Sequence, residues 1–152
     1  MKLVNHIDHV AWVFRPDTIE RNVAMFSRMF DITFDGPVHK PDFGFTVYLS
    51  WEAGIEIVCP HEKRNEFNRH LHDHLEAHGE GLMSIVWAVN DIEQTRQRLE
   101  ADGFAVGDLW GNDPKSPWRD KVSIKERDLG THMNTRIILG EIEYADGVLT
   151  IE

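Results

Sequence analysis

The stretch that decides the fold is residues 9–13, His-Val-Ala-Trp-Val, because residues 84–88, Ser-Ile-Val-Trp-Ala, repeat its pattern. A second match follows: Thr18-Ile19-Glu20-Arg21 corresponds to Asp91-Ile92-Glu93-Gln94. Matches that recur in the same order and at similar spacing indicate a structural unit that occurs twice. We therefore predict that the chain consists of two related halves.

Each half begins with a strand and a helix. Residues 7–14 and 82–89 are mostly apolar runs of strand length. Both are followed by the spacing of a capping box, which opens a helix: Asp17 with Glu20, and Asn90 with Glu93. Apolar residues of the first helix share one face, at Ile19, Val23, Phe26 and Phe30. The second helix continues through Ile92, Arg96 and Leu99.

Three shorter strand candidates follow each helix. They are residues 33–38, 45–50 and 55–59 in the first half, and 104–106, 135–139 and 148–151 in the second. Each half is thus a βαβββ module, and the predicted class is α+β. One such module leaves an apolar sheet face uncovered, so we expect two modules to pair around a cleft between curved sheets, within one chain or across a dimer.

The length of 152 residues favours one domain over residues 1–152. We expect the first module at 1–60 and the second at 82–152. Residues 110–132 are rich in charge, Pro and Gly and exceed ordinary loop lengths, which favours a flap or a binding loop inserted in the second module.

A linking helix is predicted over residues 61–81, because Phe67, Leu71 and Leu75 recur every four residues and Gly79 provides a stop. Histidines also recur every four residues along it, at His70, His74 and His78. That spacing can bring imidazoles together around a metal. Neighbouring charged residues favour a solvated helix face instead.

Composition restricts the partners. The formal charge of −10 repels polyphosphate backbones, so we expect no nucleic acid. No run approaches the ~20 apolar residues of a membrane span, and the first residues lack the apolar core of a signal peptide, so we expect no membrane and a cytoplasmic location. The single Cys59 suits a reducing compartment. A small-molecule substrate and a homodimer are the expected partners.

Four segments carry a resemblance to a known family: Ile-Asp-His-Val-Ala at 7–11, Gly-Ile-Glu-Ile-Val at 54–58, Leu-Glu-Ala-His-Gly-Glu-Gly-Leu at 75–82 and Gly-Val-Leu-Thr-Ile-Glu at 147–152. In this order they resemble the vicinal oxygen chelate (glyoxalase-like) superfamily, most closely methylmalonyl-CoA epimerases. The resemblance covers nearly the whole chain except the insertion.

The resemblance also implies positions for a divalent metal, which the family holds with one residue from each of four strands. The first position corresponds to His9 and the second to Glu56. The third falls on Ser84, and the fourth on Ile151, with Glu152 one residue further on. A catalytic metal normally takes at least three N or O ligands. The resemblance therefore implies a divalent metal only if His9, Glu56 and Glu152 together hold it.

The predicted function is an isomerase, epimerase or lyase that moves a proton next to a carbonyl of a small organic or acyl-CoA substrate. Glu56 and His9 are the expected acid–base pair, and Ser84 is placed to hydrogen-bond the substrate carbonyl. The alternative is a metal-free binding or resistance protein that sequesters an apolar or aromatic compound. A dioxygenase is third, because the two-His, one-carboxylate iron set is incomplete.

Overall fold

The computed structural model describes residues 1–150. These residues form two compact units. The first unit is Val10–Met83, and the second comprises Met1–His9 and residues from Ser84 onward. Strand β1, Ile7–Val13, and strand β5, Gly81–Ala88, each contribute residues to both units.

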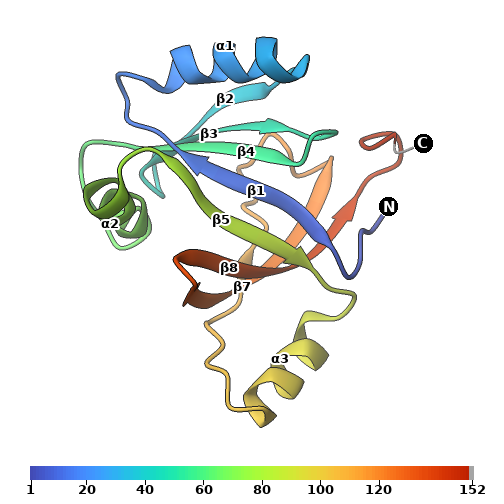
Figure 1. Ribbon diagram of the computed structural model, residues 1–152. Helices are drawn as coiled ribbons and strands as arrows, with labels where there is room; N and C mark the ends of the chain where they lie inside the picture. The colour runs from blue at the N-terminus through green and yellow to red at the C-terminus, as the bar shows by residue number, and fades with distance from the viewer. Residues whose placement is uncertain (151–152) are drawn as a thin grey trace. The chain divides into compact units, whose positions relative to one another are not determined.

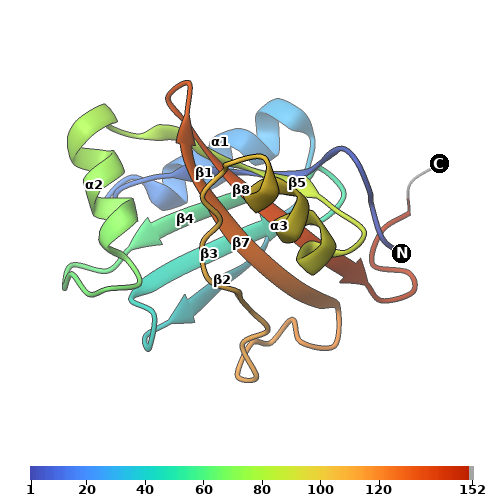
Figure 2. The ribbon, with the colours of Figure 1, turned by 90° about the horizontal axis from the view of Figure 1, so that it is seen from below.

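The sheet of the first unit has the strand order β2-β3-β4-β1. Its other strands are β2, Asp35–Lys40, β3, Phe45–Ser50, and β4, Ile55–Pro60. Strand β1 runs parallel to β4, whereas β4, β3 and β2 are joined as antiparallel neighbours. Figure 2 shows β2, β3 and β4 side by side. The sequence continues from β1 through a helix before it forms these three strands, as a βαβββ module requires.

Helix α1, Ile19–Phe30, lies over one face of this sheet (Figure 1). Ile19 and Phe26 join a buried cluster with residues from the strands, namely Phe14, Tyr48, Ile57 and Cys59. Trp12 packs on the same cluster, with its ring edge-on to Phe26 at a centroid distance of 5.1 Å. The four-and-three spacing of the apolar residues thus places one helix face on the sheet.

Helix α2, Arg69–His78, is preceded directly by a buried asparagine, Asn68. The Asn68 amide nitrogen donates to the backbone oxygens of Gly44 and Lys63, at 2.8 and 3.0 Å. Gly44 has a φ of +75°, and a Cβ atom there would lie 2.7 Å from the Asn68 amide nitrogen. The turn before β3 and the start of α2 are therefore fixed to each other, which requires glycine at position 44.

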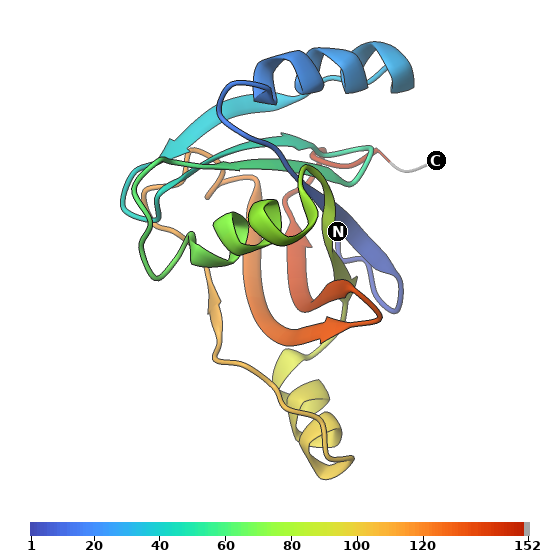
Figure 3. The ribbon, with the colours of Figure 1, turned by 60° about the vertical axis from the view of Figure 1, so that its left-hand side comes forward.

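The sheet of the second unit has the strand order β5-β8-β7-β6. Its strands after β5 are β6, Trp110–Gly111, β7, Val122–His132, and β8, Thr135–Tyr144. Strand β8 runs parallel to β5, and β7 pairs antiparallel with both β8 and β6. Figure 3 shows the β7–β8 hairpin, in orange and red, as a bent ribbon. This is the topology of the first unit, so the prediction of an α+β fold with two βαβββ modules is confirmed.

Helix α3, Ile92–Ala101, packs beside β7 and β8 in the second unit (Figure 1). Ile92 and Leu99 form a small cluster with Val89 and Leu139. The Glu141 carboxylate accepts a hydrogen bond from the Ile92 backbone nitrogen at 3.0 Å. An acidic group at a helix N-terminus accepts from an otherwise unpaired N–H group and interacts favourably with the positive end of the helix dipole. Glu141 of β8 therefore anchors the start of α3.

Both predicted capping boxes are wrong in detail. The residue before α1 is Thr18, whose side chain makes no capping hydrogen bond. Its hydroxyl instead donates to Glu80, close to the start of β5. The cap of α3 is Asp91, not Asn90, and its carboxylate accepts from the Gln94 backbone nitrogen at 2.9 Å.

The strand predictions for the second module are also corrected. Residues 104–106 and 148–150 are not strands, and the segment expected as a flap contains β6 and the long β7. The strand character of β7 is hidden in the sequence because it carries Lys125 and Arg127. These pair with Glu141 and Glu93, which are distant along the chain. No helix within residues 1–150 is both long and apolar enough to cross a membrane.

Candidate functional site

His9 lies in β1 and contacts a buried carboxylate in the second unit. Its Nδ1 atom is 2.8 Å from Oδ1 of Asp8, the preceding residue. Asp8 is 6% exposed, and its Oδ1 also accepts a hydrogen bond from the Tyr144 hydroxyl at 2.6 Å. Tyr144 ends β8, so the strand pairing of the second unit determines where its hydroxyl lies.

This arrangement orients the imidazole. A carboxylate accepts hydrogen bonds, so the His9 Nδ1 atom donates to Asp8, and Nε2 is then the basic nitrogen of the neutral ring. The same carboxylate would stabilise the imidazolium that forms when Nε2 takes up a proton. The second Asp8 oxygen, Oδ2, is buried with no hydrogen-bond partner among residues 1–150. Asp8 therefore gives His9 the orientation of a general base.

Ser84 lies in β5 and is 1% exposed. Within the described part of the chain, its hydroxyl oxygen has no hydrogen-bond partner. Its neighbour on β8 is Arg136, whose Nε and Nη2 atoms donate to Asp128 Oδ2 at 2.8 and 2.6 Å. A guanidinium has five N–H groups, so Arg136 keeps donor capacity beyond this ion pair. Ser84 and Arg136 together form a hydrogen-bond donor pair on one sheet face.

Glu56 belongs to β4 in the first unit. Its strand neighbours are Ala11 on β1 and Leu49 on β3. Ile57, the next residue, faces the α1 cluster, and successive strand residues face opposite sides. Glu56 is therefore half-buried on the sheet face away from α1, between small or apolar neighbours. This placement suits a carboxylate that contacts an organic ligand.

Comparison with known proteins identifies the family. Residues 8–119 match the profile of the Glyoxalase/Bleomycin resistance protein/Dioxygenase superfamily. The chain belongs to this superfamily. The match covers most of the first module and reaches into the second, so the resemblance inferred from residues 7–11 and 54–58 is confirmed.

Solved structures of superfamily members resemble this chain in fold. Methylmalonyl-CoA epimerase from Mycobacterium tuberculosis is 14% identical, with a TM-score of 0.65 over 93% of this chain and 90% of that one. A hypothetical protein from Bacillus halodurans is 15% identical, with a TM-score of 0.67 over 91% and 95%. Streptomyces coelicolor methylmalonyl-CoA epimerase, in complex with 2-nitronate-propionyl-CoA, is 12% identical, with a TM-score of 0.64 over 91% and 98%. No curated protein matches the chain.

The superfamily's metal does not fit the residues present. His9 and Glu56 carry donor atoms of the right type, and Ser84 offers only a neutral hydroxyl at the third position. The fourth position, Ile151 with Glu152, lies outside the described residues. Across residues 1–150 no three His, Cys, Asp or Glu side chains gather to hold a metal, and this includes the row of His70, His74 and His78. The described residues therefore do not supply the donor set of a catalytic metal site.

Three residues of the candidate site were not predicted from the sequence. Asp8 could have been found, because a carboxylate inside an apolar run beside a histidine is unusual in a strand. Tyr144 could not, because 136 positions separate it from Asp8. Arg136 gave no signal either, since its importance comes from its pairing beside Ser84.

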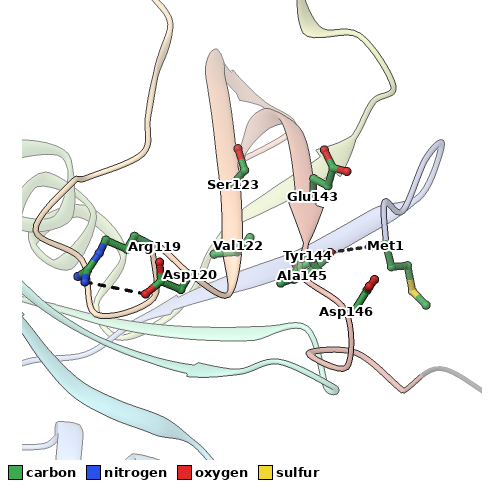
Figure 4. Close-up of a pocket in the computed structure, with 9 residues that line it drawn as sticks. All are labelled: Met1, Arg119, Asp120, Val122, Ser123, Glu143, Tyr144, Ala145 and Asp146. Carbon is green, nitrogen blue, oxygen red and sulfur yellow. Dashed lines mark hydrogen bonds and ion pairs between the residues drawn. The ribbon is translucent and has the colours of Figure 1, made fainter.

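A hollow of about 400 Å³ lies at the end of the second unit where β8 stops (Figure 4). Tyr144 and Val122 line it together with charged side chains of both signs, including Arg119 and Glu143. The backbone oxygen of Tyr144 accepts from the Met1 amino group at 2.6 Å. None of the residues predicted as catalytic lines this hollow.

Proposed function

We propose that this protein is an enzyme that transfers a proton at a carbon atom next to a carbonyl group of a small organic or acyl-CoA substrate. The observation that carries the proposal is the contact between His9 Nδ1 and the buried Asp8 carboxylate at 2.8 Å. A histidine oriented by a carboxylate is a common arrangement for a general base. The Tyr144 hydroxyl supports it by holding the same carboxylate oxygen at 2.6 Å.

The proposed reaction has two proton transfers. His9 Nε2 removes the proton from the carbon, and the electron pair of that C–H bond moves into the carbonyl to form an enolate. A proton then returns to carbon and the carbonyl forms again, and Glu56 is the acid proposed for this step. Return of the proton to the opposite face gives an epimer, and return to a neighbouring atom gives an isomer.

An enolate needs stabilisation of its negative oxygen as well as a base. Ser84 and Arg136 are the donors proposed for this task. The Ser84 hydroxyl is buried without a hydrogen-bond partner in residues 1–150, and Arg136 keeps N–H donors beside it beyond its ion pair with Asp128. A hydrogen bond to a charged oxygen in a site from which water is excluded is stronger than one in water.

Similar structures favour an acyl-CoA thioester among the candidate substrates, because two of them are methylmalonyl-CoA epimerases. Because these epimerases are only 14% and 12% identical to this chain, they support its fold and suggest which compound to test first, but they do not identify its substrate. The substrate class is therefore proposed as a carbonyl compound with an acidic C–H bond, with methylmalonyl-CoA as the first member to test.

The test is solvent exchange. We expect the protein to catalyse exchange of the acidic C–H proton for deuterium in D₂O, followed by proton NMR, with methylmalonyl-CoA and a panel of 2-substituted carbonyl compounds. His9→Gln should lower the exchange rate ~10²–10⁴-fold, and Asp8→Asn should lower it in the same direction. His6→Gln is the matched control, because the His6 side chain is exposed and its Nδ1 atom lies 2.8 Å from the backbone oxygen of Ile7 rather than from a carboxylate.

Two results would contradict the proposal. One is the absence of exchange with every compound of the panel by the folded wild-type protein. The other is exchange that His9→Gln and Glu56→Gln leave at the wild-type rate.

A further inference from the structure

The second unit contains a groove that the proposed reaction does not use. It has a volume of about 380 Å³ and lies between α3 and the sheet face that α3 covers. Its apolar lining includes Trp87, Leu129 and Ile137, and its polar lining includes Gln94 and Arg98. Ser84 and Trp87 differ by an odd number of strand positions, so Ser84 faces the other side of the sheet. The groove is therefore separate from the donor pair formed by Ser84 and Arg136.

Trp87 is more exposed than its counterpart in the first unit, Trp12. It is 39% exposed, whereas Trp12 packs edge-on against Phe26 at 5.1 Å. The repeat aligns Trp12 with Trp87 and Ile19 with Ile92, so Phe26 corresponds to Leu99. The first unit thus covers its tryptophan with an aromatic ring from the helix, and the second unit presents a leucine at that point.

The next turn of the helix shows the same difference. Phe30 stacks on Phe26 in the first unit, at a centroid distance of 5.5 Å. By the repeat, Phe30 corresponds to Gly103, which follows α3 and has no side chain. Two phenyl rings of the first unit are therefore replaced by one leucine and one glycine. The groove beside the exposed Trp87 indole thus lacks both of these rings, and aromatic rings stack favourably on such a face.

One positive charge lies at the groove. Arg98 is the one cation among the described residues that line it. Its ion pair with Asp102 spans 3.9 Å, and both side chains are more than half exposed, so this pair holds the guanidinium weakly. The carboxylate of Asp91, also in the lining, already caps α3 through the Gln94 backbone nitrogen. Arg98 is thus the group available to an anionic ligand.

We propose that this groove binds a planar aromatic molecule that carries one anionic group, with its ring on Trp87 and its anion at Arg98. The site is separate from the proposed proton-transfer chemistry and does not depend on it. Pockets for organic ligands typically combine apolar walls with a few polar groups that fix orientation, as this groove does.

The experiment titrates 2-naphthoate into the full-length protein, followed by amide chemical shifts in ¹⁵N-labelled samples and by calorimetry. We expect saturable binding of one molecule per chain, with the largest shifts in α3 and around Trp87. Leu99→Phe introduces the ring that Phe26 supplies in the first unit, so it should fill the groove and weaken binding at least ~10-fold. Trp87→Leu provides a second test in case the larger side chain disturbs the fold, and it should also weaken binding.

Charge is tested separately. Arg98→Gln should weaken 2-naphthoate binding about 3- to 5-fold, in keeping with the small energy of an exposed ion pair, and should leave the binding of neutral 2-naphthylmethanol unchanged. Arg28→Gln, an exposed arginine in the last turn of α1, is the matched control and should change neither.

Three outcomes would overturn the proposal. The first is no saturable binding by folded wild-type protein, and the second is binding that folded Leu99→Phe and Trp87→Leu proteins retain in full. The third is occupation of the groove by a second copy of the chain, which sedimentation would reveal as a dimer that Trp87→Leu dissociates and that excludes 2-naphthoate.

Discussion

The Tyr144 hydroxyl donates a hydrogen bond to Asp8 Oδ1 at 2.6 Å, which joins the end of β8 to the beginning of β1 across 136 sequence positions. Because Asp8 is buried and its second oxygen has no partner in residues 1–150, loss of this donor leaves a carboxylate poorly satisfied. Tyr144→Phe should therefore lower the free energy of unfolding by about 1–3 kcal/mol, measured by urea titration.

Tyr48→Phe is the matched control for that variant, because Tyr48 is the other tyrosine and its hydroxyl has no hydrogen-bond partner within residues 1–150. It should change the free energy of unfolding by much less. Equal losses in the two variants would show that the hydroxyl of Tyr144 contributes nothing specific.

The buried Cys59 thiol should resist modification. Burial raises its pKa to about 11, with smaller contributions from the negative charges of Asp17 and Glu80. The thiolate is the reactive form, so reaction with a disulfide reagent at pH 8 should be slow in the folded protein and become rapid in urea. Fast reaction of the folded protein would contradict this environment.

The same thiol links stability to alkaline pH. The unfolded chain releases its proton near the ordinary value of 9.0, whereas the folded chain keeps it to about 11. Stability from this group is therefore complete below pH 9 and is lost as pH rises towards 11. Cys59→Ala should reduce the loss of unfolding free energy over this interval, measured by urea titrations at several pH values.

Acid stability should depend on Glu80. Partial burial alone would raise the pKa of its carboxyl, but hydrogen bonds from the Thr18 hydroxyl and the Arg15 backbone, with the charges of Arg15 and Arg21, hold the pKa below its usual value. Its contribution is present at pH values above the ordinary pKa and is lost as pH falls through the lowered one.

Glu80→Gln should therefore lower the free energy of unfolding at pH 7, and the difference from wild type should shrink in acid. Chemical denaturation between pH 7 and pH 3 measures this trend, with Glu62→Gln, at an exposed position, as the control. A difference that stays constant across the range would mean that the charge of Glu80 is unimportant.

The fold could be predicted where its signals are local. The Trp12 and Trp87 strands are apolar runs at matching positions before helices, and sequence periodicity detects such runs directly. Strand β7 could not be found in this way. A charged residue such as Arg127 suggests a loop when only the sequence is read. In the strand its guanidinium pairs with the carboxylate of Glu93, which lies 34 positions away.

Residues of the candidate site could likewise be predicted only where the signal is local. His9 and Glu56 could be chosen because family motifs surround them, and Ser84 because it repeats the position of His9. Tyr144 and Arg136, which interact with or lie beside these residues, belong to β8. The strand predicted there, residues 135–139, was shorter than the observed Thr135–Tyr144. Long-range strand pairing brings these residues beside Asp8 and Ser84, and no local pattern records that pairing.

Metal content provides a further prediction. Since Ser84 occupies the third ligand position and provides a neutral oxygen, purified protein dialysed against a divalent metal and then against metal-free buffer should retain much less than one equivalent. Elemental analysis of the dialysed protein measures this. Retention of one equivalent per chain would contradict it, and Glu152, outside the described residues, would then be the first further ligand to substitute.

The last prediction concerns Glu56, which is half-buried on the sheet face away from α1, beside Ala11 and Leu49. Glu56→Gln preserves the shape of the side chain and removes its ability to transfer a proton. Turnover of a substrate found by deuterium exchange should therefore fall ~10²–10⁴-fold. Affinity for the same compound should change far less, because the amide keeps most of the contacts. Glu66→Gln, at an exposed position, is the matched control. Paired binding and turnover measurements separate the two effects. A loss of affinity that matches the loss of turnover would show that Glu56 binds the substrate and does not transfer a proton. Unchanged turnover would show that Glu56 takes no part in the reaction.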